Sequence, residues 1–366
     1  ERRVPTAALG GLGQLFGDLP FGREHTYVFG FSGSQVLYAG GRVSAAVGIA
    51  ERSLDAVRLD LAEQTAEVEY QVRTAYVQAL LAGAVVEATE AALEQADAFL
   101  EQERLRQRSG QASELDVLRA QVDRDNLRPQ LVQARNASEV ALLNVKRLTN
   151  VPMSATLVLA SDLGVPDTAA LGAGAPKPET VAEARAALRA AEEQVGIREQ
   201  QARIARGAFL PNVALQMNYG RQLYPAGMLE FQGDWRTDWT VTLGVQLPIF
   251  EGFRRTAEIE RARIDVRRAR LQVEQLREGL ELEYRQAVGE RERAAAAITG
   301  RQATVDMAER VYSLTELRYE QGLATQLEVN AARLSLLQAR TNLAQAVADF
   351  RIAEAGVERA MAGVGP

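Results

Sequence analysis

Two copies of one short motif in this sequence place an acidic side chain six residues after a glycine and three residues after a hydroxyl side chain. The first copy is Gly110, Ser113 and Asp116, and the second is Gly322, Thr325 and Glu328. A glycine followed by Ser or Thr and then by an acid is typical of a helical hairpin, in which one helix ends near the glycine and the next begins with a capping box. We therefore expect both carboxylates to accept hydrogen bonds from backbone N–H groups at the start of a helix.

Little else in the sequence could bind a metal or catalyse a reaction. The chain has no cysteine, which excludes disulfides, thiolate metal sites and a cysteine nucleophile. Its single histidine, His25, has Glu24 beside it but no second nitrogen donor nearby, so we expect no metal site there. The net charge of −6 is spread along the chain, which argues against binding to nucleic acid. We expect neither an enzyme, nor a cofactor, nor a nucleic-acid partner.

The two motifs belong to a longer internal repeat with an offset of 212 residues. Gly110, Ala112, Leu115, Val117 and Ala120 recur as Gly322, Ala324, Leu327, Val329 and Ala332. The same offset carries residues 38–42, Tyr-Ala-Gly-Gly-Arg, onto residues 250–254, Phe-Glu-Gly-Phe-Arg. Because the offset stays constant between these two landmarks, each half of the chain is predicted to be one unit of strand, long helix and hairpin.

Alternating apolar side chains predict strands at the start of each half. Apolar residues alternate with polar or small ones in 238–250 and again in 211–220. In the first half the alternation begins at 27–31, and a Gly-rich segment at 4–13 is predicted to be a strand mainly from the repeat. Each half would thus contribute one pair of strands.

A segment that favours one very long helix follows each pair of strands. From residue 41 to about residue 108 the chain has no proline, and a helix of this length would extend roughly 100 Å. Leu61, Val68 and Ala75 lie seven residues apart, a spacing that predicts the seam of a left-handed coiled coil. A coiled-coil shaft fits this pattern better than a globular domain.

The helices that return from the two hairpins are predicted at about 113–149 and 325–362. Pro129 lies inside the first of them and should kink it or loosen its hydrogen bonding. A segment rich in Pro, Gly and Ala at 151–178 reads as an irregular connection on the outside of the shaft. A further helix is predicted at about 179–208.

Four strands are too few to close a barrel, although each strong strand has one continuous apolar face. A soluble sandwich would cover this face with a second sheet, for which the sequence has no further strands. A membrane β-barrel would turn the face to lipid and place aromatic residues at the membrane interfaces. The chain contains no run of about 18 consecutive apolar residues, so no membrane-spanning helix is expected. These patterns favour a homo-oligomer in which several chains complete one barrel and one hollow shaft.

In the order and spacing of these pieces the sequence resembles the TolC family of outer-membrane factors. Residues 34–42 and 246–254 resemble the strand-to-helix junctions of that family, and residues 206–211, Arg-Gly-Ala-Phe-Leu-Pro, resemble its helix-to-strand junction. The two Gly-centred hairpins and the Ala-rich final helix also match. The resemblance covers essentially the whole chain, but the opening helix and signal peptide of the family are missing. The sequence opens Glu-Arg-Arg-Val-Pro without a start Met, so it is either a processed product or a chain whose first part is absent. Because a helix is predicted before the strand at 211 but nothing precedes the strand near residue 5, we expect that the N-terminal part is absent.

The resemblance implies a mainly α fold with a small β part. Three chains with four strands each would form a trimeric 12-stranded transmembrane β-barrel, continued by a long periplasmic α-helical coiled-coil barrel. The expected segments are a first β-hairpin of the barrel (1–40), a first long helix and coiled-coil hairpin (41–150), an equatorial linker (151–178), a helix leading to the second hairpin (179–210), a second β-hairpin (211–250) and a second long helix and hairpin (251–366).

The resemblance also implies the function and the partners. The chain would be the outer-membrane exit duct of a tripartite efflux pump or a type I secretion system, a passive channel in the outer membrane of a Gram-negative bacterium. Its partners would be a periplasmic adaptor protein, an inner-membrane transporter and the lipid of the outer membrane. The alternative is a periplasmic coiled-coil scaffold or adaptor without a pore of its own, but a scaffold has no use for lipid-facing strands.

Three groups of candidate site residues follow from the resemblance. The pore gate would contain Asp116, Tyr319 and Glu328, with a hydrogen bond between Asp116 and Tyr319 of neighbouring hairpins and a ring of carboxylates that favours cations. Adaptor-docking tips would contain Gly110, Ser113, Leu115, Gly322, Thr325 and Leu327. The aromatic girdle would contain Tyr27, Phe29, Tyr219, Trp235 and Trp239. Where the family has a further arginine and a second acid beyond the second glycine, this chain has Ala324 and Ala331. For any single tip residue, the plain role of turning a helical hairpin is about as good an interpretation.

Overall fold

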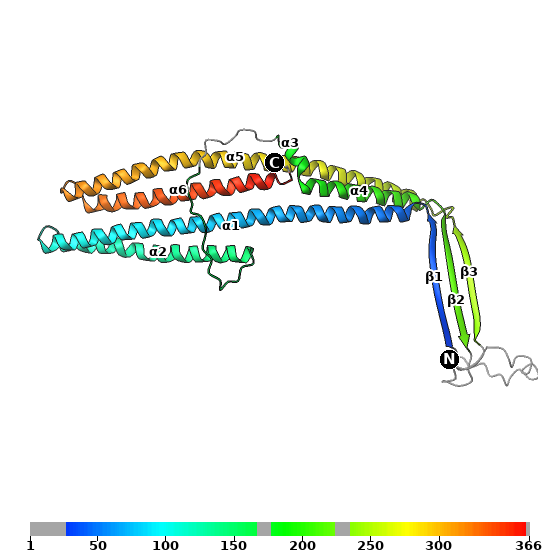
Figure 1. The fold of residues 1–366 in the computed structure, drawn as a ribbon. Coiled ribbons are helices and arrows are strands. Elements are labelled where there is room, and N and C mark those ends of the chain that lie inside the picture. The colour runs from blue at the N-terminus through cyan, green and yellow to red at the C-terminus, as the bar shows by residue number, and fades with distance from the viewer. Residues whose placement is uncertain (1–26, 167–176, 224–234, 364–366) are drawn as a thin grey trace, which may run out of the picture. The chain divides into compact units, whose positions relative to one another are not determined.

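The computed structural model describes residues 27–166, 177–223 and 235–363, and most of these residues are helical. The chain divides into two compact units, one made of residues 1–53 and 194–269 and the other of residues 54–193 and 270–366. The elements, labelled in Figure 1, are β1 (Tyr27–Ala39), α1 (Arg42–Arg108), α2 (Glu114–Leu148), α3 (Pro178–Ala184), α4 (Ala186–Gly207), β2 (Asn212–Leu223), β3 (Arg236–Gln246), α5 (Arg254–Glu320) and α6 (Gln326–Ala360).

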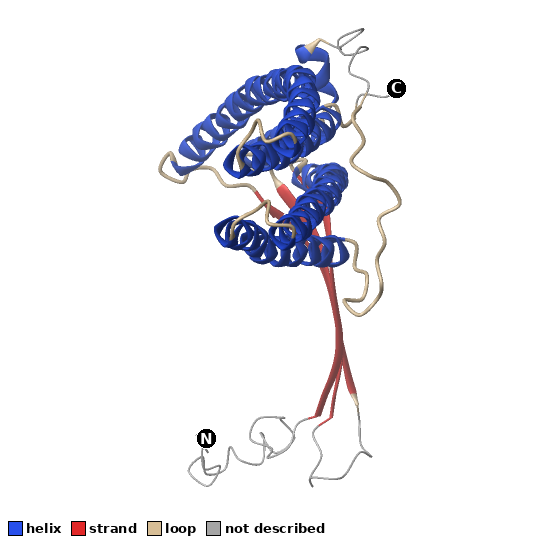
Figure 2. Ribbon diagram, turned by 90° about the vertical axis from the view of Figure 1, so that its left-hand side faces the viewer, coloured by secondary structure: helices blue, strands red, loops and turns tan. Residues whose placement is uncertain are grey.

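The three strands form one antiparallel sheet in the order β1-β2-β3, drawn in red in Figure 2. The register aligns Tyr219 of β2 with Phe31 on one side and with Trp239 on the other. Most side chains of β1 and all those of β3 are exposed. The apolar face predicted from the alternation is therefore not covered by any other part of the chain that the structure describes. The strand predicted at 4–13 and His25 lie outside the described residues.

The strand predicted at 238–250 is wrong at its C-terminal end. β3 begins two residues earlier and stops at Gln246, although the alternation of apolar residues continues to Ile249. Pro248 has no N–H to donate to a neighbouring strand, which explains why the ladder ends before it. The apolar surface therefore extends beyond the hydrogen-bonded sheet.

Two glycines allow α1 and α4 to approach each other at the foot of the sheet. Gly40 has a φ of +61°, and a Cβ atom on it would lie 2.5 Å from the carbonyl oxygen of Gly207. Only a residue without a side chain fits a positive φ at such a close backbone contact. At the first junction of the repeat, Gly40 is therefore required by its close packing against Gly207.

The helix predicted at about 179–208 is broken in two. Arg185 takes an extended conformation between α3 and α4, with φ −61° and ψ 132°. Its side chain is buried and contacts α1, α5 and the end of α6. At this break between the two helices, the side chain of Arg185 reaches Glu63, Glu283 and the carbonyl of Ala360 at the same time.

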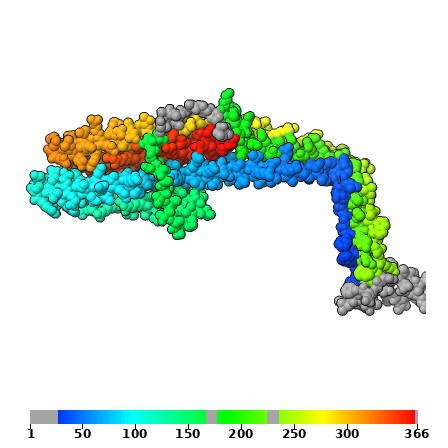
Figure 3. Space-filling model, viewed as in Figure 1, coloured from blue at the N-terminus to red at the C-terminus, as the bar shows by residue number. Residues whose placement is uncertain are grey.

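The core of the second unit combines many alanines with larger apolar residues. One cluster combines residues from α1, α2, α5 and α6, among them Leu100, Ala120, Tyr312 and Val329. The irregular segment at 151–166, seen in green in Figure 3, packs Leu157 and Leu159 against one hairpin and Leu163 against the other. α2 continues through Pro129 as one helix, so the proline does not end it.

The predicted coiled-coil seam on α1 is uncovered in its first part. Val47, Leu54, Leu61 and Val68 follow one another at intervals of seven residues, and each is between 48% and 67% exposed. Within the described residues, α1 also contains the one helical window that could cross a membrane by length and composition alone, a property that many core helices share. An apolar stripe with a seven-residue interval that the described residues leave about half exposed is the typical surface of a coiled coil between chains.

Candidate gate and docking site at the hairpin tips

The two hairpin turns have the same backbone geometry. α1 ends at Arg108 and α5 ends at Glu320, and the glycines that follow, Gly110 and Gly322, have φ values of +76° and +74°. At each tip the residue after the glycine donates its N–H to a carbonyl five residues earlier, at 2.8 Å. These bonds satisfy the last carbonyls of the helix, as in the Schellman motif.

Both acids of the repeated motif close a capping box, as the sequence predicts. The carboxylate of Asp116 accepts hydrogen bonds from the N–H of Ser113 at 2.9 Å and from its hydroxyl at 2.7 Å. The carboxylate of Glu328 accepts the equivalent bonds from Thr325 at 2.6 and 3.0 Å. The backbone hydrogen bonds lower the pKa of Asp116 and of Glu328 below their usual values.

The caps make the stability of the hairpins depend on pH. Because the folded pKa of Asp116 is lowered, its contribution is present above the unfolded pKa and is lost as the pH falls through the folded value. We expect Ser113→Ala to lower the free energy of unfolding by about 1 kcal/mol at pH 7. The difference between the wild type and Asp116→Asn should shrink toward zero as the pH falls through the lowered pKa of Asp116. Urea unfolding followed by circular dichroism at several pH values measures both effects, and a difference that persists unchanged at low pH would contradict the assignment.

Tyr319 lies between the two hairpins of the chain rather than beside Asp116. Its ring packs on Phe99 with centroids 5.2 Å apart, and the guanidinium of Arg106 lies 4.9 Å from the ring centroid. Burial, followed by a hydrogen bond to the carboxylate of Glu103, raises the pKa of Tyr319. Within this chain the carboxylate of Asp116 caps α2 and does not bind Tyr319. A hydrogen bond between Asp116 and Tyr319 of neighbouring chains stays a prediction.

Glu103 is a residue of this site that the sequence analysis missed. Its side chain is 0% exposed, and Arg106 lies 3.5 Å from one of its oxygens. A fully buried carboxylate is rare unless it is paired. The sequence offered no signal for it, because a glutamate on a long charged helix looks like any other exposed residue.

Two further polar contacts join the hairpins near their tips. The side-chain amide of Gln326 at the start of α6 donates to the backbone carbonyl of Asp116 at 3.0 Å. Farther from the tip, the buried guanidinium of Arg333 donates to the side chain of Asn330 at 2.6 Å, and Asn330 in turn hydrogen-bonds to Asp123 on α2. Side-chain hydrogen bonds therefore connect the two hairpins of one chain near their tips, and the residues on the outer side of the tips do not take part in them.

The outer surface of the tips carries exposed leucines among polar residues. The residues predicted for adaptor docking, namely Gly110, Ser113, Leu115, Gly322, Thr325 and Leu327, are all exposed, and so is Glu328. Leu327 is 75% exposed, and Leu118 and Leu323 add to the same surface. Exposed leucines on two adjacent turns offer a surface that a partner helix could cover.

The residues predicted for the aromatic girdle lie at one end of the sheet. The register aligns Tyr27 with Leu223 and Tyr219 with Trp239. Phe29 and Trp239 are exposed, and the guanidinium of Arg221 lies 5.6 Å from the ring of Trp235. The opposite end of the sheet carries a second set of exposed aromatics that the sequence analysis missed, Tyr38, Phe209, Phe250 and Phe253. A band with aromatics at both ends is typical of a strand surface that spans a bilayer.

Comparisons with known proteins agree with this architecture. The chain superposes on the outer membrane protein VceC from Vibrio cholerae with a TM-score of 0.73 and 18% identity, covering 96% of this chain and 90% of VceC. It superposes on the open state of the outer membrane channel MtrE from Neisseria gonorrhoeae with a TM-score of 0.77 and 18% identity, covering 93% and 80%. For the outer membrane channel CmeC from Campylobacter jejuni the TM-score is 0.73 and the identity 17%, covering 98% and 80%.

A search of curated proteins gave no match. A family model described as outer membrane efflux protein matches residues 18–151 and 178–363, which is most of the chain. The protein therefore belongs to the outer membrane efflux protein family, and it is an outer-membrane channel for efflux rather than an enzyme or a pore-free periplasmic scaffold.

Proposed function

We propose that three copies of this chain form the exit duct of a tripartite efflux pump. The observation that carries the proposal is the uncovered seam on α1, in which Val47, Leu54, Leu61 and Val68 repeat every seven residues and remain exposed. On α5, Ile264 and Leu271 repeat the same interval and are also exposed. A chain that presents coiled-coil seams to solvent is completed by further copies of itself.

The sheet supports the same assembly. β1 and β3 are the outer strands of the described sheet, so each has an unpaired edge there. Unsatisfied backbone groups are not tolerated at a sheet edge inside a bilayer, which is why membrane sheets close into barrels. With the strand predicted at 4–13, three chains supply the 12 strands of the proposed barrel.

The helical hairpins then form the periplasmic part of the duct, and their tips meet the partners. The exposed leucines around Leu115 and Leu327 suit docking of a periplasmic adaptor, which connects the duct to an inner-membrane transporter that supplies the energy. Type I secretion uses the same arrangement of parts and remains the second candidate. Identifying the inner-membrane transporter that co-purifies with the protein distinguishes the two.

The gate is proposed to close at the same tips. Asp116, Tyr319 and Glu328 lie on hairpins that would converge on the pore axis, where carboxylates favour cations by their local field. In this arrangement Asp116 of one hairpin and Tyr319 of a neighbouring hairpin would form a hydrogen bond between chains, for which Asp116 would share the carboxylate that caps Ser113 and Tyr319 would leave Glu103.

Single-channel recording in planar bilayers tests the gate. A hydrogen bond contributes about 1 kcal/mol net, so losing one such bond at each of three interfaces should shift the closed-to-open equilibrium by more than about tenfold. We expect the double substitution Asp116→Asn and Tyr319→Phe to raise the mean conductance accordingly. Glu114→Gln, which removes an exposed acid from the same helix turn, is the control. Unchanged conductance in the double variant would remove both residues from the gate.

A further inference from the structure

The second strand-to-helix junction keeps a phenylalanine in a strained conformation. Phe253 has a φ of +62°, while its counterpart in the first half of the repeat is Gly41, with a φ of +77°. A left-handed conformation costs a residue with a side chain roughly 1–2 kcal/mol, yet the ring of Phe253 is 77% exposed and buries little in return. Strain that is retained at an exposed side chain points to a function for that side chain.

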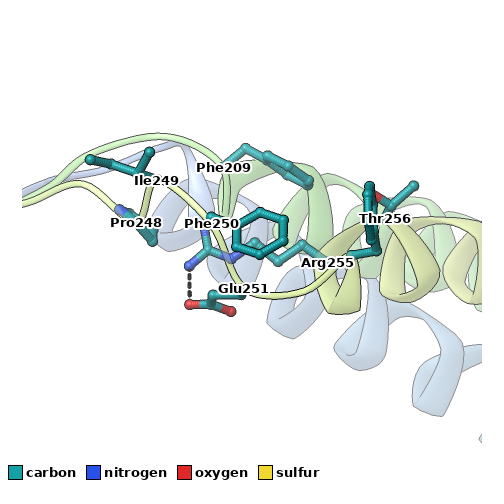
Figure 4. Close-up of a pocket in the computed structure, with 8 residues that line it drawn as sticks. Phe209, Pro248, Ile249, Phe250, Glu251, Arg255 and Thr256 are labelled. Atoms are coloured by element: carbon teal, nitrogen blue, oxygen red, sulfur yellow. Dashed lines mark hydrogen bonds and ion pairs between the residues drawn. The ribbon is translucent and has the colours of Figure 1, made fainter.

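Beside Phe253 lies a pocket of about 200 Å³ with one apolar wall and one charged wall. Phe209, Pro248, Ile249, Phe250 and Phe253 form the apolar wall, and Glu251, Arg255 and Thr256 complete the lining. Figure 4 shows Phe209 and Phe250 on one side of the Arg255 side chain and Glu251 on the other. Arg255 donates to Glu251 at 2.6 Å and to the carbonyl of Ala208 at 2.6 Å, which fixes the guanidinium at the pocket.

The pocket continues the apolar surface of the sheet. Leu243, Val245 and Leu247 are exposed on one face, and Ile249, which follows in the same alternation, is 93% exposed. Phe250 and Phe253 extend this surface with rings whose centroids are 5.8 Å apart. If the strands face lipid, as proposed above, the pocket lies where the lipid-facing surface ends and the helices begin, at the depth of lipid headgroups.

The charges of the pocket suit a zwitterion. Its lining contains one carboxylate, Glu251, and one guanidinium, Arg255, whose formal charges cancel, and Glu251 also pairs with Arg254 beside the pocket. A headgroup that carries a phosphate and a primary ammonium presents the complementary pair, because guanidinium binds phosphate and a carboxylate accepts N–H donors. Neither an anionic headgroup nor a purely apolar ligand matches both charges.

We infer that this junction binds a phospholipid with a phosphoethanolamine headgroup, its phosphate at Arg255, its ammonium at Glu251 and its acyl chains along Ile249, Phe250 and Phe253. The inference rests on the proposed membrane orientation of the sheet. The first junction offers no such site. There the repeat places Ala39 where the second junction has Glu251 and Val43 where it has Arg255, and Gly40 packs directly against Gly207. Of the two junctions, both of which the structure describes, the second therefore has the site and the first does not.

Native mass spectrometry of the detergent-purified protein, with phosphatidylethanolamine, phosphatidylcholine or phosphatidylglycerol added at equal concentration, tests the inference. Phosphatidylethanolamine should be retained at one lipid per chain and in preference to the other two, since the choline headgroup has no N–H and phosphatidylglycerol has no cation. Phe253→Gly relieves the strain and removes the ring, and should weaken phosphatidylethanolamine binding about tenfold without loss of thermal stability. Glu251→Gln should abolish the preference over phosphatidylglycerol.

Phe250→Ala and Tyr38→Ala form a matched pair, because they remove aromatic rings at equivalent positions of the two junctions. Only Phe250→Ala should reduce lipid retention. Equal retention of phosphatidylglycerol, no retention of any lipid, or an equal loss in both variants would overturn the inference. Single-channel conductance of the same preparations keeps the two proposals apart. A conducting protein without the lipid preference contradicts the lipid site alone, whereas a protein that does not conduct contradicts the proposed duct.

Discussion

Arg185→Ala is expected to lower the free energy of unfolding by about 3–5 kcal/mol, the usual cost of removing one partner of a buried ion pair. The side chain of Arg185 is 2% exposed and binds the carboxylate of Glu63 on α1 through two of its nitrogens. It lies 3.6 Å from Glu283 on α5. Its removal leaves Glu63, which is itself largely buried, without its cation.

Arg185 also holds the C-terminal end of α6. One of its nitrogens donates to the carbonyls of Arg359 and Ala360, each at 3.2 Å. Cations at a helix C-terminus interact favourably with the helix dipole and satisfy carbonyls that have no partner within the helix. One side chain therefore connects α1, α5, α6 and the break between α3 and α4.

Urea unfolding monitored by circular dichroism measures the effect. Arg185→Lys should recover only part of the loss, because an ammonium cannot bind a carboxylate through two nitrogens while it also reaches two carbonyls. Arg189→Ala, which truncates an exposed arginine one turn away, is the control and should change stability by less than about 0.5 kcal/mol. A loss below about 1 kcal/mol in Arg185→Ala would show that the buried contacts of Arg185 do not stabilise the fold.

The features that the sequence predicted are those with a local signature. The capping boxes of Asp116 and Glu328 depend on residues three positions apart, and the strands depend on alternation over about ten residues. Arg185 had no such signature, since its partners lie 122 and 175 residues away in the chain. Glu103 and Arg333 are buried by helices from the other hairpin, and nothing in their neighbours along the sequence distinguishes them from exposed charges.

At the junction of Phe253, the two copies of the repeat differ in a way that is visible in the sequence but has no evident meaning from the sequence alone. The repeat aligns Gly41 with Phe253 and Ala39 with Glu251, and these are departures from an otherwise similar segment. Only the positive φ of Phe253 and the pocket beside it give the departures a physical meaning. In a repeated chain, the positions where the copies differ are the places to look for a site that one copy has and the other lacks.

The second large effect is expected at Asp123 and Arg333, two oppositely charged side chains that Asn330 connects between α2 and α6. Burial lowers the pKa of Arg333 and raises the pKa of Asp123, so both charged forms are disfavoured where they lie. Asp123→Leu leaves a guanidinium that is 2% exposed without a carboxylate nearby and should cost about 3 kcal/mol. Arg333→Met should cost less, because Asp123 is only partly buried and can take up a proton.

The double variant Asp123→Leu with Arg333→Met should be within about 1 kcal/mol of the wild type, since removing two opposite charges together leaves neither uncompensated, and their replacement by apolar side chains is often neutral or stabilising. The coupling energy from this double-mutant cycle should therefore be at least about 2 kcal/mol. The pH adds a second check. Because the pKa of Asp123 is raised, its charged form costs stability at neutral pH, and the deficit of Arg333→Met should shrink as the pH falls through that raised value. Additive losses in the double variant would show that the two residues do not act as a pair.

The double variant Asp123→Leu with Arg333→Met also distinguishes an effect on folding stability from an effect on closure of the proposed gate. The relay of Asp123, Asn330 and Arg333 has no equivalent in the repeat, where Asp123 corresponds to Ser335 and Arg333 to Gln121. It can therefore form at the contact between the two hairpins of one chain but not, in the proposed trimer, at the contact with the next chain. Leu at position 123 and Met at position 333 restore the packing energy. They do not restore the hydrogen bonds through Asn330, which fix the position of one hairpin against the other. We expect a protein of near-normal stability whose single-channel conductance fluctuates more and is higher on average, and unaltered conductance would confine the pair to a structural role.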